Sequence, residues 1–308
     1  MIRDKFIGLN LVTIIIPTIG RPHYIIDSVR SALDQSYANL EIIISENDTQ
    51  IKTQDLLSSS SISDPRIRII STNKRLDFAE HMNFCINEAK GYYVMILSDD
   101  DQMSSGYVEE MAGLLDSDSL VVVSLGRQVY ISGNDKGRIP NSAVEESTAV
   151  YAGIEFLKRQ LAGSVPQIAT YVSLFAKKEE VLRMGGFKPY PYGAHSDNYL
   201  FFKLALHGKV ALGKNKFFYR VYSESVGLGM PFPSLLTATK KYTRDIVLEI
   251  KKLYNLGKIT KLDKKLLSNL IKSQNSGMLL GRLIRLYRKR VSFLKFLYYI
   301  ILSIIFRI

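Results

Sequence analysis

The chain has 308 residues, enough for one large domain with an appendage, and its 46% hydrophobic and 23% charged residues are typical of globular proteins. A single cysteine, Cys85, excludes an intramolecular disulfide and fits a reducing compartment. The first ten residues lack the apolar run of a secretory signal peptide, so we expect a cytoplasmic protein.

The formal net charge of +12 is carried by one end of the chain. Residues 1–250 contain 27 Lys and Arg against 28 Asp and Glu, whereas residues 251–308 contain 14 Lys and Arg against one acidic residue, Asp263. This asymmetry indicates an anionic partner for the C-terminal part, either a membrane surface or a nucleic acid.

Strands and helices are expected to alternate over the first 125 residues. Apolar, β-branched runs predict strands, and apolar residues at helical spacing predict helices between them. The predicted strands are 11–16, 41–44, 67–70, 92–97 and 120–124, and the predicted helices are 24–35, 77–89 and 105–115. Strands apolar on both faces, alternating with helices, indicate a mostly parallel sheet that binds ligands beyond the carboxyl ends of its strands.

Residues 126–225 follow a less regular pattern. The predicted strands there are 171–176, 209–212 and 217–222, and the predicted helices are 155–161 and 198–207. From Pro231 onward the sequence is helical and basic.

Three consecutive carboxylates, Asp99, Asp100 and Asp101, follow the strand predicted at 92–97. Adjacent carboxylates repel one another unless a positive charge lies nearby. Because neighbouring side chains in a strand point to opposite faces, we expect Asp99 and Asp101 to point one way and Asp100 the other. Such a pair of oxygen ligands suits Mn²⁺ or Mg²⁺ shared with a diphosphate. The alternative is that the run caps the helix expected to begin near residue 104.

Other polar candidates also follow predicted strands or precede helices. Glu46 and Asp48 follow the second strand and either accept hydrogen bonds from a nucleoside or form an ordinary turn. Asp197 is either the N-cap of the helix at 198–207 or a general base toward an acceptor hydroxyl. His195 is expected to be exposed.

Arg220 and Tyr222 follow the last predicted strand. Both are within reach of phosphates at that sheet edge, but the interpretation we favour is that they are ordinary edge or surface residues.

Several segments together resemble glycosyltransferase family 2, which has the GT-A fold. They are TIIIPT at 13–18 with Arg21, SVRSALDQSY at 28–37, EIIISEND at 41–48, AKG at 89–91, SDDD at 98–101, GGF at 185–187, SD at 196–197 and LALHG at 204–208. The resemblance implies a GT-A-type, Rossmann-like α/β fold, with a mostly parallel sheet flanked by helices, over residues 1–225. Residues 10–125 would form the nucleotide-sugar half and 126–225 the acceptor half, followed by a basic helical extension at 226–308.

The resemblance also implies roles for individual residues. Asp101, together with Asp99, would hold the metal, and Asp197 would be the catalytic base. The residues implied in nucleotide-sugar binding are Pro17, Thr18, Arg21, Glu46, Asp48, Asp99 and Asp100. The chain departs from the family pattern in three places: Glu46 replaces an Asp, Ser196 precedes Asp197 where Glu is frequent, and Asp77 stands where many relatives have Gly.

The implied activity is the metal-dependent, inverting transfer of a sugar, in a single displacement, from a nucleotide-diphosphate sugar to a hydroxyl of a glycan or polyprenol-linked acceptor, in the synthesis of bacterial cell-surface polysaccharide. One alternative is a sugar-phosphate nucleotidyltransferase, which requires a glycine-rich loop after the first strand, whereas residues 17–22 contain one Gly and two Pro. Another is a catalytically inactive, nucleotide-binding membrane scaffold.

The C-terminal residues 282–306 predict a basic amphipathic helix. Lys and Arg recur there at three- and four-residue spacing, and residues 296–306 carry no charge. A membrane-spanning helix needs about 20 apolar residues, so a helix lying in the interface fits better, anchoring the protein on the inner face of the cell membrane. The alternative is a helix that packs on the domain. Nucleic-acid binding is not expected, because it gives the apolar half of the tail no role.

Overall fold

A central sheet organises the computed structural model, which describes residues 9–48, 50, 52–132, 147–165, 174–221 and 230–288. Within these residues nine strands form one sheet in the order β3-β2-β1-β4-β8-β6-β9-β5, with β7 paired to β9. The strands are β1 (Val12–Thr18), β2 (Leu40–Glu46), β3 (Ile67–Ser71), β4 (Tyr93–Ile96), β5 (Gln102–Met103), β6 (Val121–Ser132), β7 (Ala149–Ala152), β8 (Phe175–Lys177) and β9 (Lys209–Val221).

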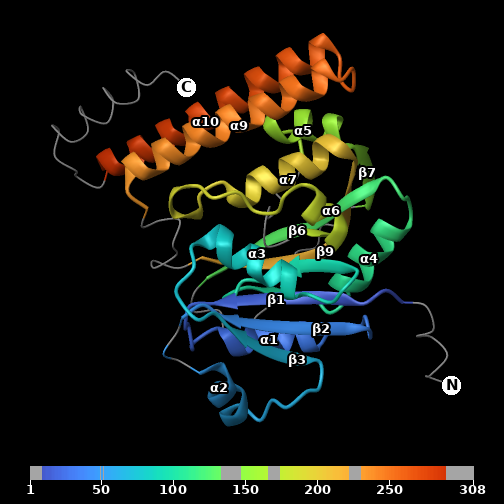
Figure 1. Ribbon diagram of the computed structural model, residues 1–308, viewed down its shortest axis with the longest axis vertical. Coiled ribbons are helices and arrows are strands. Elements are labelled where there is room, and N and C mark those ends of the chain that lie inside the picture. The colour runs from blue at the N-terminus through green and yellow to red at the C-terminus, as the bar shows by residue number, and fades with distance from the viewer. Residues whose placement is uncertain are drawn as a thin grey trace.

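Helices cover both faces of this sheet (Figure 1). They are α1 (Ile25–Leu33), α2 (Thr53–Ser59), α3 (Phe78–Glu88), α4 (Tyr107–Asp116), α5 (Gly153–Leu161), α6 (Lys178–Arg183), the short 3₁₀ helix η2 (Pro191–Gly193), α7 (Ser196–His207), α9 (Phe232–Asn255) and α10 (Lys261–Arg288). The α/β class predicted from the alternating pattern is confirmed.

The sheet is parallel in its first half and mixed in its second. β1 pairs in parallel with β2 and β4, and β2 pairs in parallel with β3. Successive side chains of β1 alternate between two cores: Ile14 and Ile16 pack with α1 and α4, whereas Ile15 packs with α3, α7 and α9. Both faces are therefore buried, as a parallel sheet requires. In the second half β6 pairs in parallel with β9, whereas β8 runs antiparallel to β4 and β6, and β9 runs antiparallel to β5 and β7.

The helices α9 and α10 form a hairpin that lies over α7 and α5 (Figure 1). Tyr242 and Ile246 of α9 and Leu267 of α10 belong to the same core as Ile15 of the sheet. The helices α9 and α10 thus share a core with the sheet, while the boundary predicted at 225/226 lies outside the described residues.

The predicted interface helix at 282–306 lies mostly outside the described residues, which end at 288. No helix in the part of the chain that the structure describes combines the length and hydrophobicity needed to cross a membrane.

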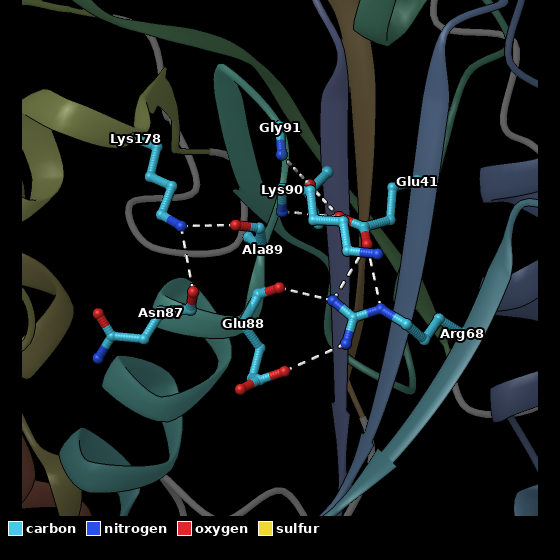
Figure 2. Close-up of polar contacts among 9 residues, drawn as sticks. Glu41, Arg68, Asn87, Glu88, Ala89, Lys90, Gly91 and Lys178 are labelled. Atoms are coloured by element: carbon cyan, nitrogen blue, oxygen red, sulfur yellow. Dashed lines mark hydrogen bonds and ion pairs between the residues drawn. The ribbon is translucent and has the colours of Figure 1, made fainter.

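Near the amino end of β2, a buried carboxylate, Glu41, links neighbouring elements of the sheet through hydrogen bonds. Glu41 accepts hydrogen bonds from the Thr13 hydroxyl at 2.7 Å and from the Lys90 backbone N–H at 2.9 Å. Figure 2 shows Glu41 between Lys90 and Arg68. Arg68 donates to Glu41 at 3.1 Å and to the backbone carbonyl of Glu88 at 2.5 Å. This network ties β1, β2 and β3 to the turn that follows α3.

Candidate active site

The carboxyl ends of β1 and β4 open into a cavity of about 490 Å³. Its walls come from β1, α3, η2, the start of α7, β9 and the start of α9. Of the predicted site residues, the lining contains Pro17, Thr18, Arg21, Asp99, Asp100 and Asp197. The structure therefore brings together residues that lie 180 positions apart in the sequence.

Asp99 and Asp100 lie in a turn rather than on a strand, because β4 ends at Ile96. The Nη1 atom of Arg21 lies 3.2 Å from Asp99 Oδ1 and 2.9 Å from Asp100 Oδ2, and Thr18 donates to Asp99 at 2.5 Å. The prediction that Asp100 points away from Asp99 is wrong. It assumed strand geometry beyond the residue where the strand stops.

Asp101 lies behind this turn, 1% exposed. Its Oδ1 accepts a hydrogen bond from the backbone N–H of Arg220 at 2.8 Å, and its Oδ2 has no hydrogen-bond partner among the described residues. The alternative that the acidic run caps a helix is wrong. The helix α4 begins only at Tyr107, and its N-cap, Gly106, has no side-chain hydrogen bond.

Burial raises the pKa values of two carboxylates in the acidic segment, Asp99 and Asp101. Burial raises the pKa of Asp99 to about 6, against the opposing effects of Arg21 and Thr18. Burial and the nearby Asp100 and Asp99 raise the pKa of Asp101 well above its usual value. Among the described residues no three His, Cys, Asp or Glu side chains form a ready metal cluster. Two stressed carboxylates with one unpaired oxygen nevertheless fit a divalent cation that takes its other ligands from a phosphate and water.

Arg220 is a fully buried cation beside the same turn. Its Nε donates to the carbonyl of Asp100 at 2.8 Å, its guanidinium lies 4.7 Å over the ring of Tyr24, and Nη2 is 3.6 Å from Asp27. Neither Nη atom has a hydrogen-bond partner in the described part of the chain. The prediction of a surface residue is wrong because β9 lies inside the sheet, between β6 and β5. Tyr222 lies outside the described residues.

Asp197 occupies the first turn of α7, and the residue that caps this helix is His195. The N-cap alternative for Asp197 is therefore wrong. Asp197 is 9% exposed, and its carboxylate adds to the effect of burial in raising the pKa of Tyr242. Burial raises the pKa of Tyr219 to about 12, with contributions from Asp101, Asp100 and Asp197. Tyr219 thus lies within electrostatic reach of both the acidic turn and Asp197.

His195 is buried, contrary to the expectation of an exposed loop residue. Its Nε2 lies 2.9 Å from the hydroxyl of Thr239, and its ring stacks on Tyr242 with centroids 4.7 Å apart. The Thr239 hydroxyl donates its proton to the carbonyl of Leu235, so Nε2 of His195 must be the donor to Thr239. Burial lowers the pKa of His195 to about 4, which keeps the ring neutral. Both partners come from α9, about 45 residues further along the chain. The sequence around His195 therefore could not predict this contact.

Glu46 and Asp48 are not part of the cavity lining. The carboxylate of Glu46 accepts hydrogen bonds from the Thr53 backbone at 2.7 Å and the Ser71 hydroxyl at 2.9 Å, which ties β2 to α2 and β3. Asp48 is exposed, with a positive φ of 53°. Asn47, which lies between them and was assigned no role from the sequence, lines the cavity instead.

A helix-flanked α/β sheet with a cavity beyond the carboxyl ends of its parallel strands is the arrangement expected of a nucleotide-binding α/β protein. Residues 13–175, more than half of the chain, match the family Glycosyl transferase family 2. The chain belongs to this family, as its motifs predict.

Three known proteins illustrate the similarity. Over 93 residues, 30% of this chain and 36% of the relative, the sequence is 37% identical to the UDP-Glc:alpha-D-GlcNAc-diphosphoundecaprenol beta-1,3-glucosyltransferase WfaP of Escherichia coli. The structure of S. aureus TarS 1-349 in complex with UDP-GlcNAc is 12% identical, with a TM-score of 0.64 over 85% of this chain and 72% of that one. The mannosyltransferase PcManGT from Pyrobaculum calidifontis, in complex with GDP-Man and Mn²⁺, is 15% identical, with a TM-score of 0.57 over 92% and 76%.

At 12% and 15% identity, the two solved structures show likeness of fold alone. The chain matches about a third of the length of curated relatives such as WfaP.

Proposed function

We propose that this protein is a glycosyltransferase that moves a sugar from a nucleotide-diphosphate sugar to a hydroxyl of a glycan or lipid-linked acceptor. The observation that carries the proposal is a single cavity with two arginines and a stressed acidic turn at one part of its wall and Asp197 at another. WfaP, by its name, uses a UDP-sugar and a diphosphoundecaprenol acceptor, and TarS binds UDP-GlcNAc.

The donor's diphosphate fits beside Arg21 and Arg220, whose guanidinium groups suit paired phosphate oxygens. Asp101 and Asp99 would hold Mn²⁺ or Mg²⁺, an assignment supported by the unpaired Oδ2 of Asp101 and by Mn²⁺ in the PcManGT complex. A divalent cation there would neutralise charge that develops on the departing diphosphate. We assign residues 10–125 to the donor half of the site, to which Arg220 of β9 is added.

Asp197 is the proposed general base. In a single displacement the acceptor oxygen forms a bond to the anomeric carbon, the bond to the diphosphate breaks, and Asp197 takes the hydroxyl proton. This step inverts the anomeric configuration, and the base is worth about 10²–10⁴-fold in rate. Asp197 lies in the first turn of α7 and lines the cavity that would hold the acceptor.

The test of the base is the Asp197→Asn variant, assayed with a panel of nucleotide sugars and methyl glycosides in Mn²⁺. Transfer should fall by at least about 10²-fold, with donor affinity unchanged, because only proton removal is lost. Asp118→Asn, at an exposed ion pair with Lys209 outside the cavity lining, is the matched control. Near-normal turnover in Asp197→Asn would refute the assignment.

The test of the cation site is the Asp101→Asn variant. It should lose the Mn²⁺-dependent part of its affinity for a nucleoside diphosphate in calorimetric titration. The same affinity in Mn²⁺ as the wild type would remove Asp101 from the site. A wild-type protein that binds a nucleotide sugar but turns over none would favour the inactive scaffold instead.

A further inference from the structure

Strained backbone is concentrated in η2 and in the two residues that join it to α7. Tyr192 has φ of 56° and His195 of 67°, and Gly193 between them has 71°. The left-handed region is unfavourable for a residue with a Cβ, and such residues persist at functional sites when their surroundings hold them. A bulky residue such as tyrosine rarely adopts this conformation, and such outliers are found at functional sites.

The surroundings do hold this segment. The Tyr190 hydroxyl donates to Asp245 of α9 at 3.0 Å, and Lys241 of α9 donates to the carbonyl of Pro189 at 3.1 Å. On the other side, a Cβ added to Gly193 would meet the Cβ of Phe78 in α3 at 2.6 Å. The segment is thus clamped between α9 and α3, and the conformation of Tyr192 is fixed by both neighbours.

The side chain of Tyr192 makes no contact in the described part of the chain that would offset the cost of its backbone strain. It is 62% exposed, and among the described residues it makes no hydrogen bond or ring contact. It nevertheless lines the cavity, together with Asn198 and Asp197 of α7 and Leu235 of α9. A fixed, exposed aromatic ring in the wall of a cavity is a surface suited to binding a ligand.

We propose that the ring of Tyr192 is the platform on which the sugar ring of the acceptor stacks. This proposal rests on the proposed function, because it assigns to Tyr192 the acceptor whose hydroxyl Asp197 deprotonates. A pyranose carries an apolar C–H face that packs against an aromatic ring while its hydroxyls stay free for polar groups. The ring comes from the α7 side of the cavity, whereas the phosphate-binding arginines come from the β1 and β9 sides. The favoured acceptors are therefore glycosides whose terminal pyranose presents a C–H face.

The test compares Tyr192→Gly and Tyr192→Phe with the wild type. The probe is the methyl pyranoside that gives the highest transfer rate with the wild-type protein. Tyr192→Gly should raise the KM for this acceptor roughly tenfold, since a stacked aromatic contact of ordinary strength is lost. Its donor affinity and slow donor hydrolysis should be unchanged. Its melting temperature should be equal or higher, because glycine adopts φ of 56° without strain.

Tyr192→Phe should keep the acceptor KM within about twofold, because the ring remains. Tyr92→Ala, at an exposed tyrosine just before β4 and outside the cavity lining, is the control and should behave as the wild type. An unchanged acceptor KM in Tyr192→Gly would overturn the platform while leaving the proposed function intact, as would a joint loss of donor affinity and thermal stability. A wild-type protein that transfers to no acceptor would overturn the proposed function and the platform with it.

Discussion

Arg220 carries a full positive charge in a place where solvent does not reach it. The cost of burying a cation is offset here by Asp27, by the carbonyl of Asp100 and by the ring of Tyr24, yet two guanidinium nitrogens keep no hydrogen bond among the described residues. A phosphate oxygen is the partner that such a group lacks.

Replacing Arg220 by Met should therefore lower the affinity for a nucleoside diphosphate by about 10- to 100-fold, the value of a charge-assisted hydrogen bond. Affinity for the uncharged nucleoside should stay the same, because it has no phosphate. Calorimetric titration of both ligands measures the difference. Arg66→Met, at an arginine paired with Asp64 and outside the cavity lining, is the control. An equal loss for nucleoside and diphosphate would indicate a damaged fold instead.

The residues that sequence alone could place in the cavity are those whose position follows from the chain near them. Thr18 and Asp99 directly follow predicted parallel strands, and such strand ends meet at one sheet edge. Arg220 and His195 could not be placed in this way. Their burial depends on strand β9 lying inside the sheet and on helix α9 covering α7, which are contacts between distant segments.

At the scale of elements, α9 reaches into the candidate site through the Thr239–His195 contact. Thr239→Val removes the hydroxyl that holds His195, two residues before Asp197, while keeping the shape of the side chain. We expect the transfer rate to fall by roughly tenfold with donor affinity unchanged, because a small misplacement of the base slows proton removal. Steady-state kinetics and donor titration separate the two effects.

Thr237→Val is the matched control for this change. Both threonines donate to the carbonyl four residues back in α9, but Thr237 is exposed and bonds nothing in α7. The helix itself is therefore perturbed equally in the two variants. If both variants lose the same rate, the loss belongs to the helix and the contact with His195 has no role.

The Glu41 network is an element-scale feature with a pH signature. Burial acts to raise the pKa of Glu41, but hydrogen bonds from Thr13, Lys90 and Arg68 hold it below its usual value of 4.5. A depressed carboxyl pKa stabilises the fold above pH 4.5, and this stabilisation is lost as the pH falls through the lower, folded-state pKa. Glu41→Gln should lower the free energy of unfolding at pH 7 by about 1–3 kcal/mol.

Urea unfolding at several pH values measures this effect, and the difference between Glu41→Gln and wild type should shrink as the pH falls below 4.5. Glu155→Gln, which breaks an exposed pair with Arg159, should change little at any pH. A difference that stays constant between pH 7 and pH 3 would mean that packing, not charge, explains the loss.

Elements with a strong local pattern were predictable, and those stabilised by tertiary contacts were not. The helix predicted at 77–89 is α3, closed at its start by a capping box between Asp77 and Glu80. The strands predicted at 209–212 and 217–222 are one strand, β9, whose polar middle falls at a register shift against β6. The backbone N–H groups of Lys214 and Asn215 there donate to the carboxylate of Glu110 in α4. The short helix α2 carries too few apolar residues to show a period.

At the scale of the whole molecule, the basic C-terminal part divides in two. α9 and the first turns of α10 are integrated into the core, with their lysines on the outside. α10 then returns the chain to the side of the molecule where α9 begins, and Arg282 donates to the carbonyl of Met230, a residue of the cavity wall. The membrane-interface helix predicted at 282–306 therefore has its first described residues on the cavity's side of the molecule.

This arrangement predicts that the full-length chain binds vesicles containing anionic lipid at low salt. Each basic residue near such a surface contributes about 1 kcal/mol, so replacing Lys289, Arg290 and Lys295 by Gln should weaken binding on the order of a hundredfold. Replacing Lys251, Lys252 and Lys258, exposed at the far turn of the hairpin, removes the same charge and should change binding little. Co-sedimentation measures both, and salt should weaken the interaction as charges are screened. Equal losses in the two triple variants would mean that net charge alone draws the protein to the membrane, with no anchor beside the cavity.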